Sequence, residues 1–184
     1  MVQGGSIGIG ATTSHAEVAN SPELRSALPA LAELANGIGD PQVRHVGTIG
    51  GSVANNDPAA DYPAAMLGLD ATIKTNKREI AADDFFQGLF TTALDQGEII
   101  TGIGITVPKR AAYAKFEQRA SRYALVGVFV AETDGGIRVA VTGAGNDGVF
   151  RATEIEQALA ANLSGDAARG VQIAVDDMLS DIHA

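Results

Sequence analysis

Apolar residues in the first half of the chain recur with two different periods. Around Ile7 and Ile9 they alternate with glycines, which predicts a short strand. Ser14 and Glu17 then have the spacing of a capping box, so a short helix should start there. From Ser21 onward, apolar residues return every three or four positions, which predicts one amphipathic helix that ends at the glycines of positions 37 and 39. Its apolar stripe consists of Leu24, Leu28, Leu31, Leu34 and Ile38.

The pattern changes to short elements between residues 62 and 107. It predicts a helix over residues 62–69, a half-buried strand over 71–75 with a hairpin partner at 78–80, and a longer strand over 98–107. Between them, Asp83-Asp84-Phe85-Phe86 predicts a helical turn that is capped by Asp. Paired carboxylates also suit acid chemistry or a hard cation. Because no other carboxylate cluster lies nearby in sequence, we interpret the pair as a cap and a solvated face.

The second half of the chain is richer in strands. Alternation predicts strands over residues 113–118, 125–133 and 137–142, with a hairpin turn at 134–136. A helix that is N-capped by Thr153 should follow, and residues 171–184 are expected to form a helix or an extended segment. Strands followed by helices favour the α+β class. We place a boundary at Pro108, which divides the chain into one domain over residues 1–108 and another over 109–184.

The amino-acid composition says little about the fold, but it excludes several classes of function. The 184 residues include 13 Lys and Arg against 22 Asp and Glu, and the net charge of −9 opposes binding to nucleic acid or to an anionic membrane through bulk charge. The chain has no Cys, so it holds no disulfide and no iron–sulfur cluster, and its three scattered His predict no metal site. No apolar run approaches the roughly 20 residues of a membrane span, and the first residues do not resemble a signal peptide. We therefore expect a cytoplasmic protein.

The segment Thr48-Ile49-Gly50-Gly51-Ser52 is not explained by packing alone. A Gly pair between hydroxyl residues can present backbone N–H groups to an anion. Residues 55–58 predict a turn, and Asp61 precedes a helix start with Pro in its first turn. A phosphate-bearing cofactor would suit this succession of elements, and a tight hairpin followed by a capped helix is the alternative. No pair of nucleophile and base is evident, so we predict no catalytic residue.

The motifs at residues 12–15, 39–44, 48–52, 57–61, 83–86, 97–100 and 115–127 occur together and in this order. This combination resembles the FAD-binding medium subunits of molybdenum hydroxylases, of the carbon-monoxide dehydrogenase and xanthine dehydrogenase type, over nearly the whole chain. Of these two types, the carbon-monoxide dehydrogenase type is the more similar. The resemblance implies an α+β fold in which residues 1–108 form the second FAD-binding subdomain of a vanillyl-alcohol oxidase-like unit. Residues 109–184 would form the C-terminal domain, an antiparallel sheet with helices on one face.

The resemblance also implies the residues of a FAD site. The Thr-Ile-Gly-Gly loop would give backbone N–H groups and a hydroxyl to the pyrophosphate. An Asn would make a polar contact, and an Asp would accept hydrogen bonds from the adenosine ribose. An Ile and a Tyr would lie near the isoalloxazine ring, although an ordinary aromatic beside a strand is the alternative for the Tyr. The predicted cofactor-binding residues are Thr48, Gly50, Gly51, Ser52, Asn55, Asp61, Ile100 and Tyr123.

The roles of the subunits in this family give the expected function. In such complexes, electrons pass from a substrate at a molybdenum cofactor in a large subunit, through [2Fe–2S] clusters in a small subunit, to FAD and then to an external acceptor. We expect an oxidoreductase subunit, a flavoprotein that works with these two partner subunits. One alternative is a flavin-free interaction module that docks onto the same partners. Another is a flavin oxidase that acts alone, for which no substrate-side residues are evident.

Two departures from the family pattern qualify this expectation. Relatives carry a further FAD subdomain before the Thr-Thr motif, with an Ala-Gly-Gly-x-Ser loop that completes the pyrophosphate site, and they continue into a closing helix after position 184. We therefore expect a fragment that is inactive alone. Because each charge-assisted hydrogen bond to phosphate is worth about 1.5–3 kcal/mol, we expect weak or no FAD binding by this chain alone.

Overall fold

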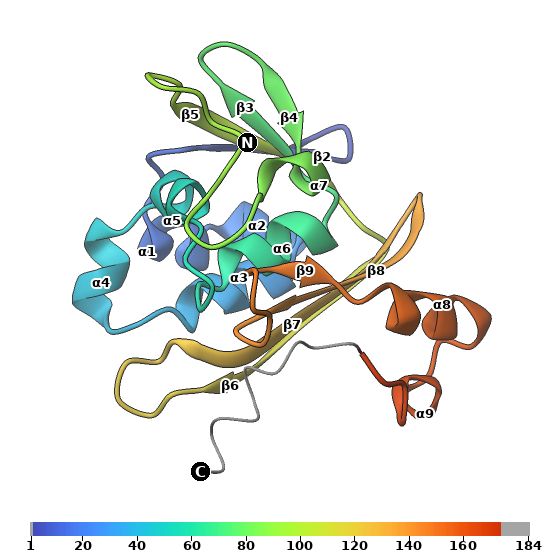
Figure 1. Cartoon of the computed structure of the whole chain (residues 1–184). Helices are drawn as coiled ribbons and strands as arrows, with labels where there is room; N and C mark the ends of the chain where they lie inside the picture. The colour runs from blue at the N-terminus through green and yellow to red at the C-terminus, as the bar shows by residue number, and fades with distance from the viewer. Residues whose placement is uncertain (1, 174–184) are drawn as a thin grey trace.

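A computed structural model describes residues 2–173, and it contains two antiparallel sheets with a layer of helices between them (Figure 1). The first sheet has the strand order β1-β2-β5-β3-β4, and the second has the order β6-β7-β8-β9. The strands of the first sheet are β1 (Val2–Gln3), β2 (Ser6–Gly10), β3 (Thr72–Thr75), β4 (Glu79–Ala81) and β5 (Ile100–Thr106). Those of the second are β6 (Arg110–Glu117), β7 (Ala124–Thr133), β8 (Gly136–Thr142) and β9 (Phe150–Arg151).

Most of the helices lie in the first half of the chain. They are α1 (His15–Asn20), α2 (Pro22–Ala27), α3 (Pro29–Asn36), α4 (Pro41–Val46), α5 (Ile49–Asn55), α6 (Tyr62–Gly68) and α7 (Ala82–Phe85), followed by α8 (Thr153–Ala161) and α9 (Gly165–Ala168). The capping box at the start of α1 is confirmed, because Glu17 N–H donates to Ser14 Oγ and Ser14 N–H donates to the Glu17 carboxylate. The helices predicted over 62–69 and after position 153 are also present.

The prediction of a single helix between Ser21 and Gly39 was wrong. The structure breaks it at Leu28 into α2 and α3, because Pro29 has no N–H to donate and its ring excludes the helical conformation from the preceding residue. Leu28 accordingly has φ −148° and ψ 67°. The apolar stripe itself was identified correctly, since its four leucines are buried in the same core.

The first sheet presents isoleucines to the helices. Ile7 and Ile9 of β2 pair with Ile105 and Ile103 of β5, and all four belong to the main core. The glycines that alternate with them occupy the positions of opposite parity, on the other face of the sheet. The strand predicted at 71–75, its hairpin partner and the longer strand that starts near residue 98 are all confirmed.

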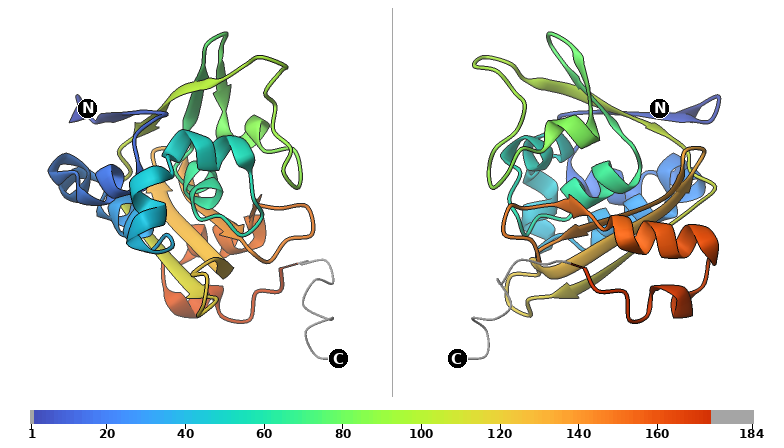
Figure 2. Two further views of the ribbon diagram at one scale, coloured as in Figure 1. Left: turned by 90° about the vertical axis from the view of Figure 1, so that its left-hand side faces the viewer. Right: turned by 45° about the vertical axis from the view of Figure 1, so that its right-hand side comes forward.

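The second sheet is packed on both faces (Figure 2). Phe129 of β7 and Ala140 of β8 join the main core with α3 and α6. On the opposite face, Val139 and Val141 pack with Leu159 of α8 in a second cluster that also includes residues of α9. The helices that follow this sheet in the chain therefore lie on one face, as the resemblance implied, and the helices of the first half cover the other.

Two predicted helix caps were wrong. The N-cap of α7 is Ala81, and the carboxylate of Asp83 instead pairs with Arg138 and with Arg151 at 3.1 Å. Thr153 is the first residue of α8, one position after the N-cap. Because Asp83 follows β4 and both arginines belong to the second sheet, these ion pairs join the two halves of the chain. The predicted division at Pro108 falls between β5 and β6 and stays a prediction, and the tail predicted over 171–184 lies outside the described residues beyond position 173.

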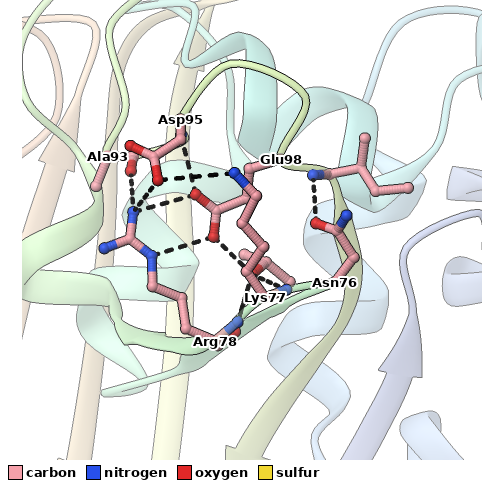
Figure 3. A network of polar contacts seen from close by, with 8 residues as sticks. Asn76, Lys77, Arg78, Ala93, Asp95 and Glu98 are labelled. Atoms are coloured by element: carbon pink, nitrogen blue, oxygen red, sulfur yellow. Dashed lines mark hydrogen bonds and ion pairs between the residues drawn. The ribbon is translucent and has the colours of Figure 1, made fainter.

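Glu98 anchors the segment that leads into β5 (Figure 3). Its buried carboxylate accepts hydrogen bonds from Arg78 Nε and Nη2 at 3.1 Å, from Thr75 Oγ1 at 2.7 Å and from the Asp95 N–H at 2.9 Å. The Arg78 hydrogen bonds, followed by those from the other donors, lower the pKa of Glu98 to about 2. Asn76 supports the same turn by accepting the Ile99 N–H at 3.0 Å.

Candidate functional site

The Gly-Gly segment forms helix α5 instead of the predicted loop. Thr48 is its N-cap. The first four N–H groups of the helix all donate within the chain: Ile49 to Thr13 O (3.0 Å), Gly50 to Ala11 O (2.9 Å), Gly51 to Thr48 Oγ1 (3.1 Å) and Ser52 to Thr48 O (3.0 Å). The expectation that backbone N–H groups of this segment stand free for an anion is therefore corrected, because the fold uses them.

The helix gathers four of the predicted residues on one face. Thr48, Gly51, Ser52 and Asn55 are spaced by three, four and seven positions, and all four line a cavity of about 440 Å³. Gly50 belongs to another face and is buried. A Cβ at Gly50 would lie 2.5 Å from the Cβ of Ala11, so this glycine permits close packing of α5 on the end of β2.

The other predicted residues divide between the cavity and the sheet. Asp61 and Tyr123 line the cavity, so six of the eight predicted residues meet there. Ile100 begins β5 and packs against the main core, and it does not line the cavity. The remaining walls include Val43 and Val46, exposed apolar side chains of α4.

Asp61 is the most buried charged group of the site. Its side chain is 5% exposed and accepts a short hydrogen bond from the Tyr113 hydroxyl, and the Lys115 ammonium lies 3.1 Å from Oδ1 and 3.2 Å from Oδ2. Burial, the largest effect, raises the pKa of Asp61, whereas the Tyr113 hydrogen bond and the Lys115 charge act in the opposite direction. Asp61 is the N-cap residue of α6 but makes no capping hydrogen bond, because its side chain faces the second sheet.

His15 is a buried polar side chain beside the cavity. It lines the cavity, is 5% exposed, and its Nδ1 has no hydrogen-bond partner among residues 2–173. Its ring lies 5.3 Å from the ring of Tyr62, whose buried hydroxyl also lacks a partner in the described chain. Burial lowers the pKa of His15, which favours the neutral imidazole at neutral pH. A buried nitrogen of this kind is available to a ligand.

A cation and an aromatic ring close the cavity on the side of the second sheet. Ser121, Arg122 and Tyr123 line it from the loop between β6 and β7. In the part of the chain that the structure describes, the Arg122 guanidinium forms no ion pair. The Tyr123 side chain is exposed at the cavity mouth.

Sequence reasoning missed His15 and Arg122 as members of the site. His15 ends the Thr-Thr-Ser-His motif and Arg122 directly precedes Tyr123, so the motifs contained both residues. What the sequence lacked was the packing that brings α1 and the β6–β7 loop to the same cavity as α5.

The described residues show neither a membrane helix nor a metal cluster. Among residues 2–173, no helix is long and apolar enough to span a bilayer. No group of three His, Cys, Asp or Glu side chains in the same range is placed to hold a metal ion.

Comparisons with known proteins identify the family of this chain. Residues 1–109 match the family model described as the FAD binding domain in molybdopterin dehydrogenase. The glyceraldehyde dehydrogenase medium chain of Sulfolobus acidocaldarius is 37% identical over 162 residues, which cover 82% of this chain and 57% of that protein. The carbon monoxide dehydrogenase medium chain of Afipia carboxidovorans is 38% identical over 141 residues, which cover 73% of this chain and 49% of that protein.

The fold is matched as well. The structure of carbon monoxide dehydrogenase from Hydrogenophaga pseudoflava superimposes with a TM-score of 0.82 at 32% identity, covering 91% of this chain and 62% of that one. This chain spans about half the length of the curated relatives it matches. The matches confirm the resemblance, the α+β fold and FAD as the cofactor of the family. The chain belongs to the FAD-binding domain family of the molybdopterin dehydrogenases.

Proposed function

We propose that this chain forms part of the flavoprotein subunit of a molybdenum hydroxylase and that the cavity beside α5 is its FAD site. The observation that carries the proposal is the arrangement of the cavity walls. One face of α5 contributes hydroxyl and amide groups, and the β6–β7 loop contributes an aromatic ring and a guanidinium that forms no ion pair among the described residues.

The side chains present fit the chemical parts of FAD. The Ser52 hydroxyl and the Arg122 guanidinium are donors for phosphate oxygens, and neither has a hydrogen-bond partner within the described chain. The carboxylate of Asp61 accepts hydrogen bonds and suits ribose hydroxyls, while Lys115 compensates its charge. Beside the same cavity, Nδ1 of the neutral His15 ring has no hydrogen-bond partner among residues 2–173. Donors, acceptors and apolar surface thus converge on one site.

The protein's own contribution is to bind, orient and shield. FAD held there would supply the redox chemistry between [2Fe–2S] clusters of a small partner subunit and an external acceptor. The apolar side chains of Val43 and Val46, together with Tyr123, would exclude water from a bound ring system. We assign no proton transfer to any residue, and the substrate would be oxidised at the molybdenum cofactor of a large partner subunit.

A charge placed on the cavity face of α5 tests the proposed site. Gly51→Asp introduces a carboxylate beside Thr48 Oγ1, where a Cβ would lie 3.0 Å away, and we expect FAD affinity to fall at least about a hundredfold through repulsion of the phosphates. The measurement is quenching of FAD fluorescence on titration with the purified protein.

Gly165→Asp is the matched control. It makes the same change at the start of α9, where a Cβ meets no atom within 4 Å, and it should leave FAD affinity unchanged. Equal FAD affinities for the parent protein and Gly51→Asp would show that the phosphates lie elsewhere.

A flavin-free docking module is the second candidate function. It is favoured by Phe116 and Leu125, large apolar side chains that are exposed where β6 and β7 meet their connecting loop. Co-purification with the [2Fe–2S] and molybdenum subunits in the absence of any bound flavin would support this role over the FAD site. Co-purification with stoichiometric FAD would support the flavoprotein.

A further inference from the structure

Lys115 lies at an unusual position for a lysine, on the buried face of a strand. The residues of β6 that share its parity, Ala111 and Tyr113, pack against the main core. The Lys115 side chain is 8% exposed. For comparison, Lys109 just before the same strand is 61% exposed, and its ammonium lies 4.0 Å from the carboxylate of Glu132. A buried ammonium needs acceptors for all of its protons.

The three donors of Lys115 reach three separate segments of the chain. Nζ donates to Gly37 O at 2.9 Å, to Asp61 Oδ2 at 3.2 Å and to Arg122 O at 2.9 Å. Gly37 ends α3, Asp61 starts α6, and Arg122 belongs to the β6–β7 loop. Asp61 and Arg122 line the cavity, and the residues that follow Gly37 line it too. One side chain thus connects three walls of the cavity.

The loop over residues 118–123 has one hydrogen bond to this lysine and several within itself. Its other hydrogen bonds are internal: Gln118 N–H donates to Tyr123 O at 2.9 Å, Arg122 N–H donates to Gln118 O at 2.8 Å, and the Gln118 side chain accepts N–H groups of the loop. Within the described chain, Lys115 makes the one hydrogen bond that ties residues 118–123 to any residue outside them. Arg122 also has φ 61°, in the left-handed region that a side chain disfavours.

We propose that Lys115 is a positioning residue, which holds the loop over residues 118–123, and with it Tyr123, across the mouth of the cavity. Its contact is with the Arg122 backbone carbonyl, so it acts through the loop and not on the ligand. The inference rests on the proposed function only in identifying the covered cavity as a FAD site. The hydrogen bond between Lys115 and the loop is present in the protein without flavin.

A single tryptophan can report on the loop directly. The chain contains no Trp, so Tyr123→Trp gives a unique fluorophore beside Arg122. The parent protein for the test is this variant of the full chain without added flavin. Acrylamide quenching of the tryptophan fluorescence measures the exposure of the loop, and urea denaturation measures global stability separately.

The decisive pair of variants differs only at Lys115. Asp61→Asn in the Tyr123→Trp parent retains Lys115 and its hydrogen bonds to the Gly37 and Arg122 carbonyls, and its quenching constant should stay close to that of the parent. Lys115→Met with Asp61→Asn avoids an unpaired buried carboxylate, and its quenching constant should rise about twofold or more as the loop opens. Lys109→Met is the matched control for the change of side chain and should have no effect.

Local exposure and flavin affinity distinguish the two proposals. If the introduced tryptophan is quenched equally in the Asp61→Asn protein and in the protein that also carries Lys115→Met, while both remain folded, Lys115 does not position the loop.

If the protein with Lys115→Met and Asp61→Asn does not fold, Lys115→Arg replaces the doubly substituted protein. It preserves the charge but not the three directions of the ammonium, and an unchanged quenching constant for it would overturn the positioning role. Binding of FAD with equal affinity by the protein with its natural Tyr123 and by its Gly51→Asp variant would overturn the FAD site and leave the quenching result standing.

Discussion

Two buried carboxylates, Glu98 and Asp61, each face a cation, yet their surroundings shift their pKa values in opposite directions. Glu98 accepts two hydrogen bonds from Arg78 and others from Thr75 and the Asp95 N–H, and its pKa is lowered to about 2. Asp61 has Lys115 and the Tyr113 hydroxyl, and burial raises its pKa despite both. Hydrogen bonding outweighs burial at Glu98, whereas burial outweighs hydrogen bonding and the Lys115 charge at Asp61.

The two carboxylates also differ in how far away in the sequence their partners lie. The partners of Glu98 lie within residues 75–98, so this carboxylate closes a turn between neighbouring strands. The partners of Asp61 lie 52 and 54 positions further along the chain, on the second sheet, and Asp61 lines the cavity. Glu98 stabilises its own segment, whereas Asp61 joins two halves of the molecule at the candidate site.

The largest expected effect comes from removing the cation at the cavity. Lys115→Met leaves the Asp61 carboxylate buried without its counter-charge, and we expect the free energy of unfolding to fall by about 3–5 kcal/mol. Arg78→Met should cost less, because Glu98 retains the Thr75 and Asp95 donors and the Arg78 side chain is about half exposed to water. Urea denaturation monitored by circular dichroism measures both.

The control for this comparison is the neutralised pair. Lys115→Met together with Asp61→Asn should recover part of the loss, since no charge is then left buried. If Arg78→Met proved more destabilising than Lys115→Met, this expectation would be wrong. Glu98 would then depend on its cation more than Asp61 does.

A smaller effect should separate ligand binding from stability. Ser52→Ala removes a hydroxyl from the cavity face of α5, and we expect FAD affinity to fall about tenfold, equivalent to ~1.4 kcal/mol for one hydrogen bond to a charged group. Glu98→Gln should leave FAD affinity unchanged, because Glu98 does not line the cavity. Fluorescence titration measures both, with Ser26→Ala in α2 as the matched hydroxyl control. A comparable loss in Glu98→Gln would abolish the distinction between the two regions.

Local signals in the sequence predicted most of the strands and several helices. The capping box at Ser14 and Glu17 and the alternation of Ile7 and Ile9 depend on residues a few positions apart, and both predictions are confirmed. The break between α2 and α3 was equally local, since Pro29 is visible in the sequence, but the continuous apolar stripe outweighed it. Predicting such a break requires giving proline precedence over periodicity.

The site was predicted less completely because its chemistry depends on distant partners. The two adjacent glycines show this most directly: Gly51 lines the cavity, whereas Gly50 packs on Ala11, and nothing within the Gly-Gly motif distinguishes them. The first two N–H groups of α5 donate to the carbonyls of Thr13 and Ala11, which lie more than thirty positions away in the chain. Likewise, the pairing of Asp61 with Lys115 follows from the packing of the second sheet on α6 and has no sequence signature.

The remaining expected effect is a difference in the sign of two pH dependences. The folded pKa of Glu98 lies below its ordinary value of 4.5, so its contribution to stability is complete above pH 4.5 and is lost as the pH falls toward about 2. The folded pKa of Asp61 lies above its ordinary value of 3.8, so the folded protein gains stability from this group as the pH falls through the raised folded value toward 3.8.

Urea midpoints at a series of pH values reveal the two slopes. The difference in unfolding free energy between the parent protein and Glu98→Gln should shrink with acidification between pH 4.5 and 2. The corresponding difference for Asp61→Asn should move in favour of the parent protein as the pH falls toward 3.8. Because each difference is taken against the same parent, titration of all other groups cancels. If the two free-energy differences changed with pH in the same direction, Lys115 and Tyr113 would outweigh burial in setting the pKa of Asp61. The two carboxylates would then differ only in their location.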